Sequence, residues 1–368
     1  MLRMFMRCPP YRVREGRSPE RRLGRLALIA SGLLISMAGR AAPAPVVSWE
    51  GRTMGTFYTV QLAGVAPGDR RLVELRAAVD RRLDEINRCL SHYLPDSELS
   101  RFNAAASTAP IKVSDELARV LRHALELHRR SEGAFDPTLG QLINLWGFGP
   151  EIRSQPQAPA DAEIAAARRQ GGARHLRVTS QDELQKDIPG LQLNLGAMGK
   201  GYGADEAARV LRDRGFTNVL VSVCGEMVAC GVNSEGQPWQ VGVERPRYTS
   251  GRYHTEICAV VPLSGGALST SGDAHNFFRD ARGRVYAHIL DPATGRPVQH
   301  NLASVTVRAA NGLMADGLAT ALYVMGPERG LHWVEQQRDI AALFIVREGP
   351  DRFRFIASAR FPPFRKLD

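Results

Sequence analysis

Cysteine is scarce in this sequence and follows no metal or redox spacing. The 368 residues include five cysteines, and no two of them form a C-x-x-C pair. This argues against a cysteine-ligated zinc site and against a thioredoxin-like redox pair. We interpret the four cysteines after residue 45 as small buried thiols. A bridge between Cys224 and Cys230, which export from the cytosol would permit, is the alternative.

Several familiar catalytic motifs are also missing. The sequence contains no G-x-S-x-G, no H-E-x-x-H and no cysteine–histidine arrangement with a supporting motif. These absences leave serine hydrolases, zinc proteases and cysteine proteases without support.

Excess positive charge is lacking from most of the chain, although the total is +10. Residues 1–45 hold nine arginines and two glutamates, a net of +7, so the remaining residues carry only +3. The basic isoelectric point near 9.8 is therefore largely a property of the first 45 residues. A nucleic-acid-binding protein would place its basic residues in the folded part, and we predict no nucleic-acid partner.

The beginning of the chain has no apolar run of the ~20 residues that a membrane span needs. A basic stretch ends at Arg25, thirteen apolar or small residues occupy 26–38, and small residues follow at 41–44. This is the layout of a secretory signal peptide, with cleavage between Ala41 and Ala44. We predict a cleaved signal peptide at 1–43, a mature domain at 44–368 and an exported, periplasmic protein. An uncleaved leader that anchors the protein at the inner membrane is the alternative.

Helical and strand patterns are mixed along 44–368 without a regular βαβ repeat, which predicts an α+β fold, a mixed-strand, two-lobed single domain. Apolar residues at helical spacing predict helices at 71–90, 116–130, 204–214 and 314–324. Alternation or short apolar runs predict strands within 46–62, interrupted at 54–56, and at 191–195, 219–223, 239–244, 257–262, 286–290, 303–308 and 341–346. We expect loops at 91–103 and 269–273, and a surface connection at 149–170.

A glycine-rich stretch from Asn194 to Gly203 precedes the helix expected at 204–214. Its four glycines would let the backbone approach a ligand, and Lys200 and the positive helix N-terminus would favour a phosphate. The stretch matches neither a Walker loop nor G-x-G-x-x-G. A plain tight turn explains the composition equally well.

Asp316 and Thr320 are four residues apart and so share one face of the helix predicted there. A carboxylate and a hydroxyl both supply the oxygen ligands that Mg²⁺ takes beside phosphate oxygens and water. A helix-capping role for Asp316 and a hydrogen bond from Thr320 to the preceding turn is the alternative. His288 lies beside the Asp-Pro and Thr-Gly turn at 291–295, where it could accept a proton or serve only structure.

Taken together, these segments resemble the ApbE family of FAD:protein FMN transferases. The motifs occur in family order as MGT (54–56), SHYLPDSELSRFN (91–103), GAFDPT (133–138), LGAMGKGY (195–202), STSGD (269–273), HILDPATG (288–295) and ADGLATA (315–321). Each motif is short, but seven in order over most of the mature chain make a specific match. The resemblance implies the ApbE flavin transferase fold.

The resemblance also implies a reaction and its partners. Members of this family use Mg²⁺, cleave FAD and attach FMN by a phosphoester bond to a Thr or Ser hydroxyl of a target flavoprotein, releasing AMP. The targets are subunits or domains of membrane-linked electron-transfer systems. An FAD pyrophosphatase that uses water as acceptor, and a non-enzymatic periplasmic flavin-binding protein, are the alternatives.

By position, the resemblance makes Asp316, Thr320 and the main-chain carbonyl of Ala197 the metal ligands and His288 the base. The implied FAD contacts are Met54, Tyr93, Ala134, Phe135, Asp136, Asn194, Lys200 and Leu290. Asn194 stands where the family often has Asp, which alters one polar flavin contact. Cys224 and Gly225 replace the usual Gly-Gly pair and constrain that turn more tightly.

Overall fold

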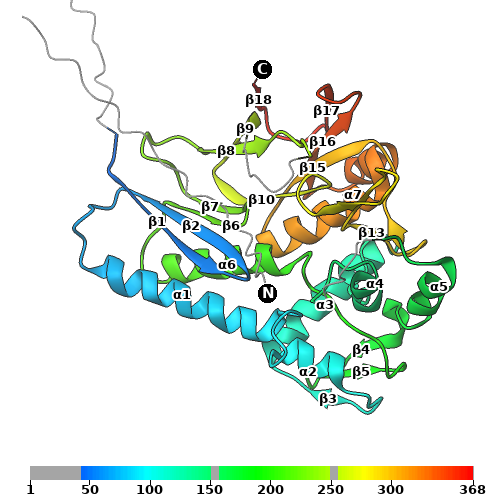
Figure 1. Ribbon diagram of the computed structural model, residues 1–368. Helices are drawn as coiled ribbons and strands as arrows, with labels where there is room; N and C mark the ends of the chain where they lie inside the picture. Colours follow the sequence, from blue (N-terminus) through cyan, green and yellow to red (C-terminus); the bar gives the residue numbers. More distant parts are fainter. Residues whose placement is uncertain (1–42, 151–156, 249–255, 368) are drawn as a thin grey trace, which may run out of the picture.

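The computed structural model describes residues 43–150, 157–248 and 256–367, so nearly all of the predicted signal peptide at 1–43 lies outside the described residues. The largest element is an eight-stranded antiparallel sheet (Figure 1). Its strands, in spatial order, are β1 (Val46–Thr53), β2 (Thr56–Ala63), β6 (Val219–Val223), β7 (Glu226–Cys230), β10 (Gly265–Gly272), β15 (Leu302–Ala309), β16 (Ala341–Arg347) and β17 (Phe353–Ala357).

Helices cover one face of this sheet, and a small three-stranded sheet covers the other (Figure 1). The covering helices are α1 (Arg71–Leu90), α3 (Asp115–Arg130), α6 (Gly199–Arg212) and α7 (Gly312–Glu335). The small sheet consists of β8 (Trp239–Glu244), β9 (Ile257–Leu263) and β18 (Arg365–Lys366).

The remaining elements form a second group beside the large sheet (Figure 1). They are α2 (Glu98–Ala104), β3 (Ile111–Lys112), α4 (Gly140–Leu145), α5 (Asp161–Arg169), a 3-10 turn (Ala173–His175), β4 (Leu176–Val178), β5 (Glu183–Lys186), β11 (Phe277–Arg279), β12 (Val285–Ala287), β13 (Leu290–Asp291) and β14 (Arg296–Pro297). A small core of Leu142, Trp146, Ile164 and Leu290 holds α4, α5 and β13 together.

The large sheet has a hydrophobic core on each face, one under the helices and one under the small sheet, and the alternation of side chains along its strands explains both. In β6, Val221 and Val223 face the helices, whereas Leu220 faces the small sheet, and all three are buried. β16 repeats the pattern with Phe344 and Leu343 on opposite faces. Because successive side chains of a strand point to opposite sides, a sheet covered on both faces needs continuous apolar strands. The α+β fold class predicted from the sequence is confirmed.

Most predicted elements are present, and the differences have local causes. Residues 191–195 form no strand, and α6 begins at Gly199 instead of residue 204. None of the four glycines in this stretch has a positive φ, but a Cβ atom at Gly201 or Gly203 would lie 3.0 Å or less from a neighbouring atom, so close packing explains these two. Residues 269–272 lie inside β10, and α2 occupies part of the loop expected at 91–103. The connection at 149–170 contains α5, and its residues 151–156 lie outside the described ranges.

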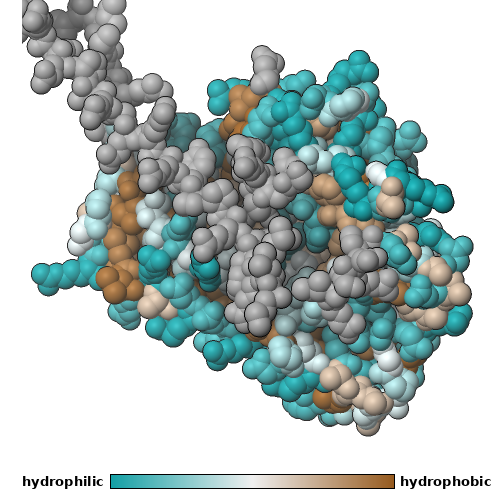
Figure 2. All heavy atoms as spheres, viewed as in Figure 1, coloured by the Kyte–Doolittle hydropathy of each residue, from teal (hydrophilic) through white to brown (hydrophobic). Residues whose placement is uncertain are grey.

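Hydrophilic side chains cover most of the face seen in Figure 2, with hydrophobic atoms in short bands between them. Within the described ranges, none of the helices is both long enough and apolar enough to cross a membrane. The four cysteines at positions 89, 224, 230 and 258 are free thiols. The alternative of a Cys224–Cys230 bridge is therefore wrong for this structure.

α7 is longer than its predicted core at 314–324 and bends near its middle. Gly326 has φ 78° and ψ 177°, and Pro327 follows it. Because Pro327 has no N–H, the carbonyl of Tyr323 loses the partner that a regular helix would provide. The Nε2–H of His300 donates to that carbonyl at 2.7 Å and replaces the missing hydrogen bond.

We expect His300→Ala to lower the free energy of unfolding by about 1–3 kcal/mol, because a largely buried carbonyl loses its donor. His300→Gln should recover part of this loss, since its side-chain amide can donate from a similar place. Urea unfolding followed by circular dichroism measures both variants. Equal stability of His300→Ala and the wild type would contradict this explanation of the bend.

Candidate functional site

The site is built where the first turns of α6 and α7 cross with backbone against backbone. A Cβ atom at Gly201 would lie 2.0 Å from the carbonyl oxygen of Gly312, and one at Gly312 would lie 2.3 Å from that of Gly201. No real Cβ atom tolerates such distances, so both positions require glycine. The crossing brings the two helix N-termini together.

Each helix supplies a carboxylate to the N-terminus of the other. Asp205 of α6 accepts hydrogen bonds from the N–H groups of Gly312 (2.7 Å) and Leu313 (2.8 Å). Asp316 of α7 accepts one from the N–H of Gly201 at 2.9 Å. These bonds satisfy first-turn N–H groups that have no partner within their own helix. Burial raises the pKa of Asp205 to about 6, although the two N–H donors lower it.

Lys200 lies between two buried carboxylates. Its Nζ is 3.2 Å from Oε1 of Glu226 and 3.4 Å from Oδ1 of Asp316, and it also reaches the carbonyl of Gly196 at 3.4 Å. Burial lowers the pKa of Lys200, but the charges of Asp316 and Glu226 outweigh it and hold the pKa above its usual range. Burial and the charge of Asp316 raise the pKa of Glu226 against the opposing effect of Lys200.

Thr320 lies one helical turn beyond Asp316, on the side of α7 that packs against β10. Its Oγ1 is 3.1 Å from Oγ of Ser271 in β10. The predicted pair of metal ligands therefore faces the same region, bounded by the ends of β7 and β10. Ala197, the third predicted ligand, is half-buried in the turn that leads into α6, next to Gly196.

These groups fit a small divalent cation. Among the described residues, Oδ1 of Asp316 contacts only Lys200, at 3.4 Å, while its other oxygen accepts from the N–H of Gly201, so lone pairs remain for a metal. A lysine ammonium already occupies the space between the oxygens of Asp316, Glu226 and Gly196, which shows that this arrangement favours positive charge. Across the described residues, no cluster of three or more His, Cys, Asp or Glu side chains could hold a metal. The predicted set contains one carboxylate and relies on a hydroxyl and a carbonyl.

His288 lies between β12 and β13, near Lys200, whose charge contributes to its titration. Its backbone N–H and its Nδ1 both contact the carbonyl of Asn276, at 3.0 and 3.2 Å. Because a carbonyl can only accept, Nδ1 carries the proton in the neutral ring and Nε2 is the free acceptor. Burial, with a smaller contribution from the charge of Lys200, lowers the pKa of His288 to about 4, although the hydrogen bond with Asn276 opposes this shift.

Aromatic rings line the side of the site next to His288. The Phe148 ring contacts His288 edge-on with centroids 6.3 Å apart, and Phe278 lies 5.7 Å from Phe148. The hydroxyl of Tyr93 donates to the carbonyl of Phe148 at 3.1 Å, and the Tyr93 side chain is 56% exposed. Such an exposed aromatic surface is suited to a flat heteroaromatic ligand.

Hydrogen bonds bring the 133–137 loop beside the turn before α6. The N–H of Asn194 donates to the carbonyl of Pro137 at 2.8 Å, and its Oδ1 accepts from the N–H of Gly196 at 2.9 Å. Asp136 turns inward and accepts hydrogen bonds from the N–H and hydroxyl of Thr138. Asn194 and Asp136 thus shape these segments in addition to any contact with a ligand.

Three of the predicted flavin contacts offer little side-chain surface, and a fourth, Met54, is half-buried. Ala134, Phe135 and Leu290 are at least 94% buried, and Leu290 belongs to the small core around Trp146. Met54 packs its methyl group against Gly203 of α6. Contacts with a ligand from Ala134, Phe135 and Leu290 would have to come from their main-chain atoms.

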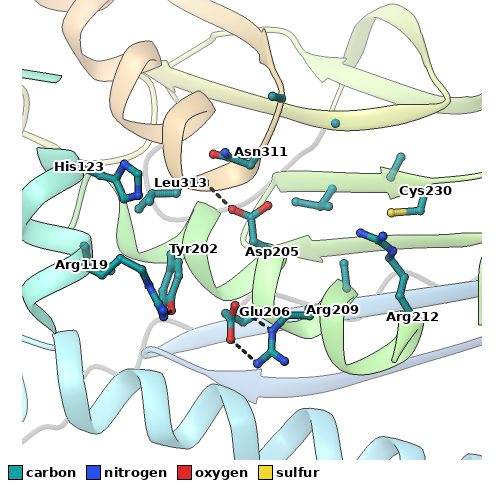
Figure 3. A pocket seen from close by; sticks show the side chains of 16 residues that line it. Arg119, His123, Tyr202, Asp205, Glu206, Arg209, Arg212, Cys230, Asn311 and Leu313 are labelled. Atoms are coloured by element: carbon teal, nitrogen blue, oxygen red, sulfur yellow. Dashed lines mark hydrogen bonds and ion pairs between the residues drawn. The ribbon is translucent and has the colours of Figure 1, made fainter. Parts of the chain in front are cut away.

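A cavity of about 350 Å³ lies between α3, α6 and the start of α7 (Figure 3). It is lined by none of the residues predicted for the site. Several of its charged side chains already have partners: Glu206 pairs with Arg209 at 2.8 Å, and Arg119 donates to Tyr202 at 2.9 Å. We therefore place the candidate site at the α6–α7 crossing, on the side that carries Lys200.

Glu226, Ser271, Phe148 and Phe278 belong to the site but were not predicted. Glu226 is 4% exposed and follows the turn at Cys224 and Gly225, both of which have positive φ. An acidic residue at the start of an apolar strand is the signal that could have identified it. No local pattern distinguishes Phe148 or Phe278 from core aromatics.

Comparison with known proteins identifies the family. The profile of the ApbE family matches residues 54–344. The chain belongs to the ApbE family. The curated relatives of this ApbE protein include FAD:protein FMN transferases of Vibrio cholerae and Klebsiella pneumoniae. Each is 40% identical and covers 92% of this chain, with 98% and 97% of the relative matched. The solved structure of the flavin transferase ApbE from Vibrio cholerae superimposes with a TM-score of 0.76 over 87% of this chain and 99% of its own.

The glycine crossing of this ApbE protein generates a paired test. We expect Gly201→Ala to lower the free energy of unfolding by about 2 kcal/mol or more, because the added methyl group meets the backbone of α7. Gly199→Ala is the matched control, since nothing lies within 4 Å of its Cβ position, and alanine there should be neutral or stabilising by up to ~1 kcal/mol. Urea unfolding distinguishes them, and similar stabilities for the two variants would refute the role of the crossing.

The titration of His288 generates a second test. The folded protein holds its pKa at about 4, below the ordinary 6.5, so the unfolded chain binds more protons between these values. His288 therefore makes stability fall as the pH decreases from 6.5 towards 4. His288→Asn keeps a donor for the Asn276 carbonyl and should reduce this loss, measured by urea unfolding at pH 7 and pH 5. An unchanged pH slope would contradict the buried, neutral histidine.

Proposed function

We propose that this protein is a Mg²⁺-dependent FAD:protein FMN transferase. It would cleave FAD, attach FMN by a phosphoester bond to a Thr or Ser hydroxyl of a target flavoprotein, and release AMP. The observation that carries the proposal is the contact of Asp316 with Lys200 and Gly201 at a helix N-terminus, with Thr320 one turn further along α7. The names of the curated relatives support the transfer of FMN from FAD to a protein.

The residues at the crossing suit the diphosphate of FAD. The N-terminus of α6 carries partial positive charge, and Lys200 adds a full charge in its first turn. Asp316, Thr320 and the carbonyl of Ala197 would hold Mg²⁺, which neutralises charge on the phosphate oxygens during transfer. The exposed ring of Tyr93 and the neighbouring Phe148 would contact the flavin.

His288 is suited to the proton transfer. Its Nε2 is free because Nδ1–H is held by the carbonyl of Asn276, and the lowered pKa keeps the ring neutral at pH 7. In the proposed reaction Nε2 accepts the proton of the target hydroxyl. The hydroxyl oxygen forms a bond to the FMN phosphorus, and the bond from that phosphorus to the bridging oxygen breaks, so AMP leaves.

The same proposal covers location and partner. The signal peptide predicted at 1–43 supports export to the periplasm, and its uncleaved form would keep the enzyme at the inner membrane. The target would then be a flavoprotein subunit or domain of an electron-transfer system that exposes a Thr or Ser hydroxyl on the same side of that membrane.

The decisive experiment incubates the exported protein with FAD, Mg²⁺ and a flavoprotein target domain. We expect mass spectrometry to detect the target heavier by one FMN unit and AMP in equal amount. AMP released without an adduct would instead identify a pyrophosphatase, and FAD recovered intact would identify a flavin-binding protein. Expression with the full leader lets the intact mass of the enzyme also test cleavage between Ala41 and Ala44.

Asp316→Asn is the matching variant. It keeps an oxygen acceptor for the N–H of Gly201 but removes the charge that would hold the metal, so adduct formation should fall by about 100-fold or more. Asp213→Asn, at the exposed end of α6, is the control and should retain full activity. Wild-type rates in Asp316→Asn would overturn the metal assignment.

A further inference from the structure

One ammonium group serves two buried carboxylates at the site. Glu226 and Asp316 are 4% and 2% exposed, and both contact Nζ of Lys200. The three groups together carry one surplus negative charge when both acids are ionised. Burying a net negative charge is costly. The charge is neutralised only if a further cation binds or one of the carboxylates takes up a proton.

The two carboxylates differ in what else they do. Asp316 is a predicted metal ligand, and its Oδ1, the oxygen that faces Lys200, is the one not used by Gly201. Glu226 is not among the predicted ligands. Its Oε2 accepts a hydrogen bond from the N–H of Thr270 at 3.3 Å, which leaves Oε1 directed at Lys200.

A divalent cation on Asp316 would compete directly with Lys200. Both require Oδ1 of Asp316, and two cations at hydrogen-bonding distance of one oxygen repel each other strongly in a buried setting. Lys200 is on a flexible side chain and already touches Glu226, so it can leave Asp316 without losing its charge partner.

We propose that Glu226 is a positioning residue that holds Lys200 away from Asp316 when Asp316 takes the divalent cation. In the metal-free site the ammonium group of Lys200 contacts Oδ1 of Asp316. When the metal binds, Lys200 leaves Asp316 and pairs with Glu226 alone. Glu226 thereby sets how tightly the site binds metal, without being a ligand. This inference rests on the proposed Mg²⁺ site.

The test measures the affinity of the protein for Mn²⁺ in the absence of FAD and target. Electron paramagnetic resonance detects the free Mn²⁺ that remains in solution. Glu226→Gln should weaken Mn²⁺ binding by about tenfold, because Lys200 then stays with Asp316. Lys200→Met should tighten it, because the competing cation is gone. In the Lys200→Met background, Glu226→Gln should change the affinity by less than about threefold.

The four proteins, wild type, Glu226→Gln, Lys200→Met and the double variant, form a double-mutant cycle. The cycle distinguishes movement of Lys200 to Glu226 from a direct electrostatic effect of the Glu226 charge on the metal. If Glu226 acts only through its charge, its effect on Mn²⁺ binding will be the same with and without Lys200, and the proposal is overturned. Asp205→Asn is the control for a charge near Asp316 that does not contact Lys200, and its effect should be additive with Lys200→Met. Glu226→Asp, which keeps the charge, replaces Glu226→Gln in the cycle if that variant does not fold.

The failure of this inference can be distinguished from the failure of the metal site. Wild-type protein that binds no Mn²⁺, or Asp316→Asn protein that binds it equally well, would overturn both. Loss of binding in Asp316→Asn together with an additive cycle would leave the metal site in place and remove only the role of Glu226.

Discussion

The backbone contact between Gly201 and Gly312 is the constraint on which the site depends. Only two residues without side chains allow α6 and α7 to cross so closely that each helix hydrogen-bonds the N-terminal N–H groups of the other. This contact fixes the distance between Lys200 and Asp316, which come from helices far apart in the sequence. The large sheet holds the crossing in place because α7 packs on β10 and β15.

Electrostatics follow from this packing. Two helix N-termini meet at the crossing, and buried carboxylates compensate their partial positive charge. Asp205 gives both of its oxygens to N–H groups of α7, whereas Asp316 gives one oxygen to α6 and leaves the other facing Lys200. The side of the crossing that carries Asp205 is therefore structural, whereas the side that carries Asp316 keeps a carboxylate oxygen available for a ligand. Neutral His288 completes the available side.

The sequence predicted the parts of this arrangement that depend on short-range periodicity. The apolar stripe of α1 and the i,i+4 spacing of Asp316 and Thr320 are visible in any window of a dozen residues. The start of α6 was misplaced because glycines in its first turns look like a loop, although Gly201 and Gly203 serve close packing here. Glu226 was missed because its role depends on Lys200, and no local pattern shows which residues meet across the fold. Ser271 was read as part of a loop because its strand, β10, is rich in small polar residues.

The order of strands in the large sheet has a consequence for how the chain folds. The β1–β2 hairpin comes first among the described elements, but the neighbour of β2 in the sheet is β6, which begins only at Val219. The hairpin must therefore remain with an unpaired edge until all the elements from α1 to α6, which lie between β2 and β6 in the chain, have been made. Such distant pairing slows folding and exposes a strand edge meanwhile.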